Sequence, residues 1–381
     1  MGVGAQFPAE WHTYTDRLTG VAVWQLTRYK GHSHHFYFTN PGWYDNGRRL
    51  LFASDRENRT NLYSLELASG VITQLTDLAP LPLPREVEFL RACVSTVTNE
   101  AYFWHGYQLL ALDLATLTTR VLYEMPQGWD VSMINATADG RYVCASISED
   151  LSDRFPVDLL RGYVGFYETW EAKPRSRILR VAVDGSGADV VWEEDYWVGH
   201  VNTSPTQPHL LTFCHEGPWH LVDNRIWGLD MATGEAWQLR PREEEGEKVG
   251  HEYWHADGLH ISYHGEKPNG HRFFGCMRYD GREQQEVAFP HTTGHIHSND
   301  FNLIVGDGGR VVRLWQWTGD GFAGPKALCR HDSSMHIQQT HVHPRFSPDG
   351  ATVVFTSDVS GYGNVYMVDL PDFATLPDLE D

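Results

Sequence analysis

An internal repeat constrains the fold of this chain more than any other feature. Residues 42–77 and 346–370 share one pattern: an aromatic residue, an Asn-Gly or Asp-Gly pair, a short apolar stretch, a polar turn and an alternating apolar stretch. Asn46-Gly47 and Asp349-Gly350 are hairpin signals, because glycine takes a positive φ without steric cost. The pattern therefore predicts pairs of antiparallel strands that recur along the chain.

Weaker copies of the pattern fill the chain between these two segments. They lie at residues 97–123, 135–147 with 177–192, 209–217 with 225–240, 254–265 with 272–289, and 300–309 with 311–321. We count about seven units, each of roughly 40–50 residues. This period and the strand-like content predict an all-β fold, a seven-bladed β-propeller of four-stranded blades. A pair of β-sandwiches with coincidental turns is the competing interpretation.

The two ends of the chain predict how the ring of blades closes. The last unit stops after its third strand at residues 365–370, whereas the first unit continues into a further strand at residues 68–77. Residues 18–28 match residues 68–77, so we expect an N-terminal strand to complete the last blade and remove its open edge. The expected organisation is a single β-propeller domain over residues 1–381. An insertion at about 150–174 is expected to form a short amphipathic helix or a loop over one face.

Charge and hydropathy exclude two classes of partner. The chain has 50 acidic and 30 basic residues and a formal net charge of −20, whereas a nucleic-acid binder needs a basic surface. No stretch approaches about 18 apolar residues, so we expect no membrane span. The cysteines stand singly and are expected to be free buried thiols of a reducing compartment: Cys93, Cys144, Cys214, Cys276 and Cys329. Because the N-terminus lacks a basic and apolar leader, we expect a cytoplasmic protein.

Histidines supply the strongest functional signal, because many of the 21 recur at equivalent positions of the repeat. They stand just before or at the first strand of successive units: His32, His34, His35, His200, His251, His295, His297, His341 and His343. In a propeller these strands and the loops that lead into them line the mouth of the channel. We therefore expect these imidazoles to converge.

The sharpest single motif is QQTHVH at residues 338–343. Side chains at i and i+2 of a strand point to the same side, so His341 and His343 can converge on one ion. Imidazole is a common ligand of manganese, iron, nickel and zinc. A second cluster, His295 and His297, lies in the preceding unit. Two such clusters favour a metal site over a purely structural role.

A third constellation joins residues 213–227 to residues 250–254. Arg225 can pair with an anionic substrate group through its planar guanidinium. His251 can accept a proton, because an imidazole titrates near neutrality. The structural alternatives stay open: Arg225 forms a salt bridge with Asp223 or Glu216, and His251 is a hydrogen-bonded histidine at the entry to a blade.

Over almost the whole chain, from residues 13–27 to residues 355–370, the sequence resembles the oligogalacturonate lyases, a family of seven-bladed propeller polysaccharide lyases. The most specific stretches are YWVGH (196–200), FCHEGPWHLVDNRIW (213–227), GHEYW (250–254), HIHSND (295–300), VGDG (305–308) and QQTHVHPRFSPDG (338–350). The resemblance implies β-elimination of short pectin fragments. It also implies a manganese ion held by three histidines and one glutamine, a histidine acting as Brønsted base and an arginine close to it.

The resemblance assigns roles residue by residue. The catalytic base falls on His251 and the arginine on Arg225. The implied metal ligands are His295, Gln338, His341 and His343. His297 stands where the relatives have another residue, so we do not expect it to be a ligand. Within the matched stretches, His200, His215 and Tyr253 are expected to bind the oligouronate substrate together with Arg225.

Two other classes of function stay open. Residues 31–43 and 81–108 match the family loosely, so a lyase or hydrolase for a different uronic-acid glycan is one alternative. The other is a non-catalytic TolB-like propeller binding module, which shares the FSPDG and FTSD motifs of residues 346–358. These motifs are typical of a β-hairpin and carry little information about function.

Overall fold

The computed structural model describes residues 2–83, 85–291 and 293–379, and seven antiparallel sheets contain all of its strands. Contacts divide the chain into two compact units. The first comprises Met1–Leu90, Leu114–Leu117 and Pro290–Asp381, and the second comprises Arg91–Asp113 and Thr118–Phe289. Five of the sheets join four strands that follow one another in the sequence, which is the arrangement of propeller blades, and the other two also take in strands from the N-terminal segment. The predicted seven-bladed β-propeller is confirmed, the sandwich interpretation is wrong, and the single-domain organisation stays a prediction.

The first unit contains three blades. One comprises β4 (Ser33–His34), β5 (Trp43–Tyr44), β6 (Arg49–Ser54), β7 (Asn61–Glu66) and β8 (Ile72–Gln74), with β1 (Gln6–Phe7) paired to β8. The next comprises β25 (Ile296–His297), β26 (Leu303–Gly308), β27 (Val311–Trp317) and β28 (Phe322–Arg330). The third comprises β29 (Arg345–Phe346), β30 (Thr352–Ser357), β31 (Asn364–Asp369), β3 (Ala22–Gln25) and β2 (His12–Thr15). Three short 3₁₀ helices lie between or after these strands: η1 (Arg56–Asn58), η2 (Gln338–Thr340) and η3 (Phe373–Thr375).

The second unit contains four blades of four strands. They comprise β9 (Cys93–Ser95), β10 (Glu100–His105), β11 (Gln108–Asp113) and β12 (Thr119–Glu124); β13 (Trp129–Ala136), β14 (Tyr142–Glu149), β15 (Arg175–Ala182) and β16 (Ala188–Asp195); β17 (Val198–Thr203), β18 (Leu210–His215), β19 (Ile226–Asp230) and β20 (Glu235–Leu239); and β21 (Lys248–Trp254), β22 (His260–Glu266), β23 (Arg272–Arg278) and β24 (Gln285–Ala288).

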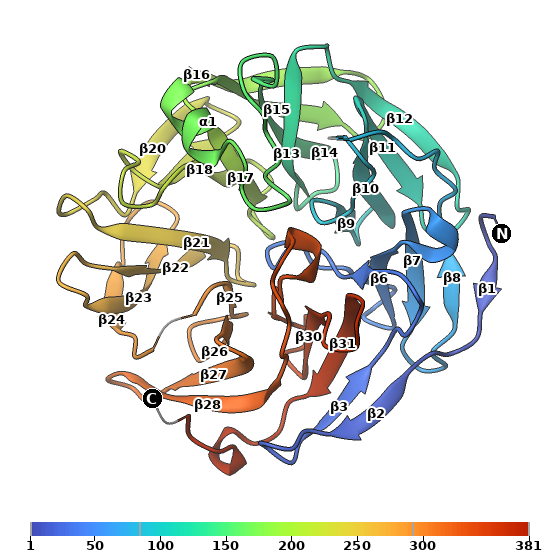
Figure 1. Ribbon diagram of the computed structural model, residues 1–381. Helices are drawn as coiled ribbons and strands as arrows, with labels where there is room; N and C mark the ends of the chain where they lie inside the picture. The colour runs from blue at the N-terminus through green and yellow to red at the C-terminus, as the bar shows by residue number, and fades with distance from the viewer. Residues whose placement is uncertain (1, 84, 292, 380–381) are drawn as a thin grey trace. The chain divides into compact units, whose positions relative to one another are not determined.

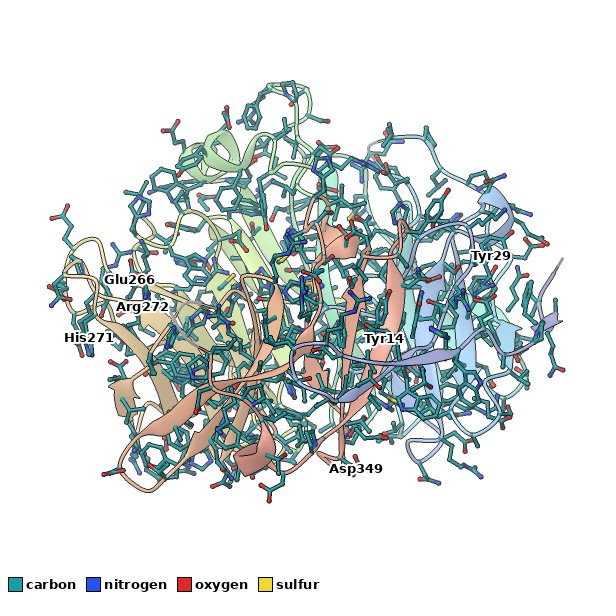
Figure 2. All side chains as sticks on the ribbon, turned by 60° about the horizontal axis from the view of Figure 1, so that its bottom comes forward. Tyr14, Tyr29, Glu266, His271, Arg272 and Asp349 are labelled. Carbon is teal, nitrogen blue, oxygen red and sulfur yellow. The ribbon has the colours of Figure 1, made fainter. Side chains whose placement is uncertain are left out.

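The N-terminal strand completes the last blade, as predicted. Trp24 of β3 pairs with Met367 of β31, and Gln25 pairs with Tyr366. Figure 1 shows β2 and β3 beside β31, although the N-terminus and the 360s are far apart in the sequence. The strand β2, which carries Tyr14 (Figure 2), adds a fifth strand outside β3 that the repeat did not predict.

The predicted hairpin turns have the expected backbone conformation. Asn46 and Gly47, between β5 and β6, have φ values of 54° and 78°, and Gly350, between β29 and β30, has φ 71°. All three lie in the left-handed region, which glycine and asparagine tolerate best. The local sequence therefore determines where these strands reverse.

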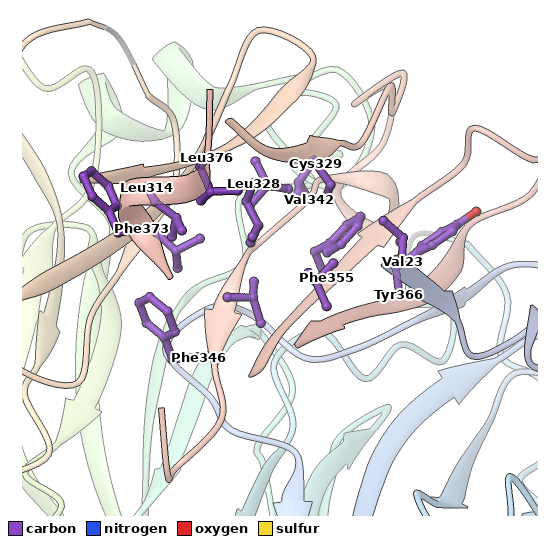
Figure 3. Close-up of a cluster of buried hydrophobic side chains, with 14 residues drawn as sticks. Val23, Leu314, Leu328, Cys329, Val342, Phe346, Phe355, Tyr366, Phe373 and Leu376 are labelled. Atoms are coloured by element: carbon purple, nitrogen blue, oxygen red, sulfur yellow. The ribbon is translucent and has the colours of Figure 1, made fainter. Parts of the chain in front are cut away.

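Hydrophobic side chains of neighbouring blades pack against each other. One buried cluster, drawn in Figure 3, joins the blade of β25–β28 to the blade of β29–β31 through residues such as Leu314, Leu328, Phe355 and Tyr366. Val23 of β3 belongs to the same cluster and is 0% exposed. Burial of apolar area in this packing supplies the main stabilising term.

The predicted insertion contains the only α-helix of the described residues, α1 (Phe166–Ala172), between β14 and β15. The Phe166 ring packs edge-on against Trp197, with 5.5 Å between the ring centroids. Trp170 lies over Gly217, where an added Cβ would come within 2.3 Å of the indole. The helix therefore docks beside the start of β17 and the loop after β18.

Two further observations concern the cysteines and the helices. All five cysteines are free and buried. Across residues 2–83, 85–291 and 293–379, we find no helix with the length and apolar character needed to cross a membrane.

Deletion of residues 1–28 is expected to cause aggregation, because it would leave the edge of β31 unpaired. Val23→Asp should have a similar effect by placing a carboxylate in the buried cluster, whereas Leu18→Asp, at a side chain that is 48% exposed, should not. Light scattering and size-exclusion chromatography measure the outcome. A soluble and fully active truncated protein would contradict this role of the N-terminal strand.

Candidate metal centre and candidate active site

Three histidines of the first unit converge. His295 directly precedes β25, and His341 and His343 follow η2. One ligand atom from each of these imidazoles lies within 4.8 Å of the other two. The ring centroids of His295 and His343 are 4.2 Å apart, and His341 lies 5.6 Å from His295 and 5.7 Å from His343. These three are implied metal ligands, and the fold brings them together.

The backbone of the HxH motif differs from the prediction. Residues 341–344 form no strand, since β29 begins only at Arg345. His343 has φ 45°, in the left-handed region, whereas His341 is extended with φ −63° and ψ 146°. A left-handed residue breaks the alternation of side chains along a strand. The imidazoles of His341 and His343 therefore converge through an irregular backbone, and not because they lie on one side of a strand.

Asp307 of β26 orients His295. The backbone N–H of His295 donates to Oδ1 of Asp307 (2.7 Å), and its ring Nδ1–H donates to Oδ2 (2.7 Å). Nε2 of His295 is then the nitrogen that carries a lone pair. Gly294 permits this contact, because a Cβ there would lie 2.6 Å from Oδ1 of Asp307. Asp307 was missed as a site residue, although it lies within the conspicuous VGDG stretch.

Burial favours the neutral form of His341 and His343. Burial and then the neighbouring His295 lower the pKa of His341 to about 4, and the same causes lower the pKa of His343 well below its usual range. Nδ1 of His341 and Nε2 of His343 are buried and make no hydrogen bond with the described residues. Neutral imidazoles with unused nitrogens are the form that binds a divalent metal, so this donor set fits such an ion.

The predicted glutamine ligand, Gln338, lies shortly before His341 in the chain. Gln338 begins η2 and is half-buried, and its carbonyl accepts the N–H of His341 (3.1 Å). The ligand role of its amide stays a prediction. Oε1 of the neighbouring Gln339 is buried and has no hydrogen-bond partner among the described residues. His297, not expected to be a ligand, accepts the N–H of Phe346 at Nδ1 (3.3 Å).

The histidine-rich and loosely matched segment at residues 31–43 packs against the cluster of His295, His341 and His343. Tyr37 lies edge-on to His343 and His295, with centroid distances of 4.8 and 5.7 Å, and Phe38 lies 5.5 Å from His295. His35 is buried, its Nε2 lies 3.3 Å from the carbonyl of Val342, and burial lowers its pKa to about 3. The loosely matched segment thus forms an aromatic wall that the sequence analysis did not assign.

A second constellation, in the second unit, surrounds Arg225. Its Nη1 donates to Oε1 of Glu216 (2.7 Å), and its Nε lies 3.8 Å from Oε2 of Glu252. Arg225 and Glu252 are 6% and 2% exposed. Nε of Arg225 and both carboxylate oxygens of Glu252 are buried without a hydrogen-bond partner among the described residues. Of the two salt bridges that the sequence left open, the one with Glu216 forms, and an unused buried donor remains.

His200 shares the carboxylate of Glu216. Nε2 of His200 lies 3.0 Å from Oε2 of Glu216, and His200 has φ 47° where the register of β17 and β18 shifts. Burial raises the pKa of Glu216, but Arg225 and His200 outweigh it and hold the pKa well below its usual range. Although His200, Cys214 and Glu216 could group around a cation, Arg225 already provides positive charge there, which disfavours a second cation.

The surroundings of His215 suit neither a base nor a metal ligand. Its Nδ1–H donates to Asp223 (2.6 Å) and its Nε2–H to Glu194 (3.2 Å), while its ring stacks on Tyr196 at 3.9 Å. Burial lowers the pKa of His215, but the effect of the two carboxylates is larger, so the pKa is raised overall. With both nitrogens donating, the ring has no lone pair to offer. Tyr253, in β21, is only 2% exposed, and its predicted role in substrate binding stays a prediction.

His251 lies in β21 and has φ 53°, at the point where the pairing of β21 with β22 changes register. Its Nδ1 lies 3.0 Å from Nε2 of His264, and the two rings are nearly parallel at 17°. Trp219 lies edge-on to His251 at 4.7 Å, and the guanidinium of Arg225 is 5.8 Å from the same indole. Trp219 thus contacts both predicted catalytic residues, His251 and Arg225. Neither Trp219 nor His264 was assigned from the sequence.

Comparisons with known proteins agree on one family. The sequence model of a family described as oligogalacturonate lyase matches residues 1–316. An oligogalacturonide lyase of Pectobacterium atrosepticum is 28% identical over 403 residues, which cover 98% of this chain and 99% of the relative. An oligogalacturonate lyase of Dickeya dadantii is 27% identical with the same coverage of each chain. A solved oligogalacturonate lyase in complex with manganese superposes with a TM-score of 0.87 at 29% identity, over 98% of this chain and 99% of that one.

Proposed function

Because the chain belongs to the oligogalacturonate lyase family, we propose that it cleaves short oligogalacturonates by β-elimination and leaves a 4,5-unsaturated uronate at the new end. The observation that carries the proposal is the cluster of three imidazoles, His295, His341 and His343, in a chain of this family. Family membership also argues against the TolB-like binding module.

The reaction begins at a weak acid. The proton on C5 of a uronate is α to a carboxylate, so its removal adds negative charge to a group that is already anionic. An enzyme for this step must neutralise the carboxylate and place a base at C5.

We assign the first task to a divalent cation, held by His295, His341 and His343 with Gln338 as the fourth ligand. Manganese is our choice, because a solved member of the family was obtained in complex with it. When bound, this ion supplies a Lewis acid for the substrate carboxylate. Asp307 fixes the tautomer and the orientation of His295, and the wall of Tyr37 and Phe38 keeps water away from the imidazoles.

We assign the second task to His251. Its neutral imidazole takes the C5 proton: the C5–H bond breaks, an N–H bond forms, and the electron pair remains on the substrate. The pair then forms the C4=C5 double bond while the bond from C4 to the glycosidic oxygen breaks. The departing oxygen takes a proton from water.

Arg225 stabilises the negative charge of the reacting uronate in this proposal. Arg225 is buried and has little contact with water, and Glu216 accepts a hydrogen bond from its Nη1. The guanidinium is therefore preorganised before the reaction. The buried Nε supports the role, because a substrate oxygen would supply the hydrogen bond that this donor lacks among the described residues.

A cytoplasmic location is part of the proposal. All five thiols are free and buried, as is usual where the surroundings are reducing. The natural substrates would then be fragments small enough to be imported.

An ultraviolet assay tests the proposed function. The conjugated double bond of the product absorbs in the near ultraviolet, so absorbance should rise when the protein meets oligogalacturonate and Mn²⁺, stop with a chelator and resume when Mn²⁺ is restored. Oligomers of other uronic acids form the comparison arms, because residues 31–43 and 81–108 match the family loosely. New reducing ends without absorbance would indicate a hydrolase, and activity only on another uronate would revise the substrate.

A further inference from the structure

We infer that His264 is a positioning residue for His251: it accepts the Nδ1–H of His251 and so leaves Nε2 of His251 as the nitrogen with the lone pair. The inference rests on the proposed role of His251 as the base. It concerns the reaction already proposed and adds the group that prepares the base for it.

The geometry of the pair is well supported by its surroundings. Nδ1 of His251 lies 3.0 Å from Nε2 of His264, which belongs to the neighbouring strand β22. His264 pairs in register with Gly250, and the register then shifts by way of His251 and its φ of 53°. This irregularity turns the His251 ring over the partner strand, where it lies parallel to His264 with 5.2 Å between centroids.

Trp219 fixes both rings from the side. It meets His251 at 4.7 Å and His264 at 5.7 Å, with interplanar angles of 83° and 84°. Gly250 makes room for the indole, because a Cβ there would lie 2.5 Å from it. The rings are therefore held in place, and the hydrogen bond between them is a fixed element of the site.

One hydrogen bond between two neutral imidazoles permits two arrangements, because each ring has one donor and one acceptor. If His264 donated, Nδ1 of His251 would accept, Nε2 of His251 would carry the hydrogen, and no nitrogen of His251 could take the C5 proton. If His251 donates, the lone pair of its ring lies on Nε2, and this nitrogen can take the proton. The proposed chemistry therefore requires the second arrangement.

The contact also grows stronger as the reaction proceeds. When Nε2 of His251 takes the proton, the ring becomes cationic, and a hydrogen bond from a charged donor is stronger than one from a neutral donor. His264 thus stabilises the protonated base more than the resting base. Its loss should lower kcat and leave KM nearly unchanged.

Two variants separate the acceptor from the ring. His264→Phe keeps an aromatic ring and removes the acceptor, whereas His264→Gln keeps an acceptor oxygen. We expect His264→Phe to lower kcat at least about 10-fold and His264→Gln to keep most of it. Equal activity of His264→Phe and the wild type would overturn the inference.

The resting protein gives an independent readout. Nitrogen NMR of ¹⁵N-histidine-labelled protein distinguishes protonated from unprotonated ring nitrogens, and the spectrum of His251→Ala identifies the His251 signals by their loss. We expect His251 to be protonated at Nδ1 in the wild type. Protonation at Nε2 would overturn the inference whether or not the variants fold. If His251→Ala kept its activity, the base assignment would fail; if only His264→Phe kept it, the inference alone would fail.

Discussion

Replacement of His251 by alanine is expected to lower kcat at least about 10²-fold, the usual size of a general-base contribution. Metal binding should stay intact, because His251 is not among the proposed ligands. Steady-state kinetics with oligogalacturonate, together with a Mn²⁺ titration, measure both quantities. His271→Ala is the matched control, because this histidine is exposed on the β22–β23 hairpin, next to Glu266 and Arg272 (Figure 2).

The rival bases are His200 and His215, and their surroundings explain why we expect His251 to dominate. Both nitrogens of His215 donate to carboxylates, and Nε2 of His200 lies against Glu216. The raised pKa of His215 favours its protonated form, which is a disadvantage for a base, and the contact with Glu216 occupies Nε2 of His200. If His251→Ala kept near-normal kcat while His200→Ala lost it, the base would have to be reassigned, although the lyase proposal could stand.

Replacement of His341 or His343 by alanine is expected to abolish metal-dependent turnover. Each variant removes one of three imidazoles whose ligand atoms lie within 4.8 Å of one another, so Mn²⁺ affinity should fall by more than about 10²-fold. The fold should survive, because Nε2 of His343 and Nδ1 of His341 make no hydrogen bond that the variants would break among the described residues.

Calorimetric titration with Mn²⁺ and thermal unfolding without metal measure the two effects separately. His336→Ala is the matched control, since His336 is exposed and lies in the same segment of the chain. Full activity of either variant in metal-depleted buffer would show that the metal assignment is wrong.

The blades could be predicted from the sequence because each one depends on local information. Turns such as Asn46-Gly47 and alternating apolar residues recur along the chain, and the match of residues 18–28 to 68–77 was enough to predict the pairing of β3 with β31. The strands β1 and β2 were not predicted, because short exposed edge strands carry little pattern.

The candidate sites were predictable in their residue types and less so in their geometry. His295, His341 and His343 meet as expected, but the left-handed φ of His343 replaces the strand that the spacing implied. Asp307 and His264 escaped notice because their importance comes from the partner that the fold brings to them. A carboxylate or an imidazole in a strand has no local signal that names its partner.

The left-handed backbone of His200, His251 and His343, with φ values of 47°, 53° and 45°, has a consequence for engineering this protein. Such a conformation costs a residue with a Cβ about 1–2 kcal/mol relative to a right-handed one, and glycine largely escapes that cost. Glycine at any of the three positions would therefore relax the backbone and remove an imidazole at once. Selection for heat resistance alone would favour those losses, so a thermostabilised enzyme of this kind has to gain its stability at positions away from these three histidines.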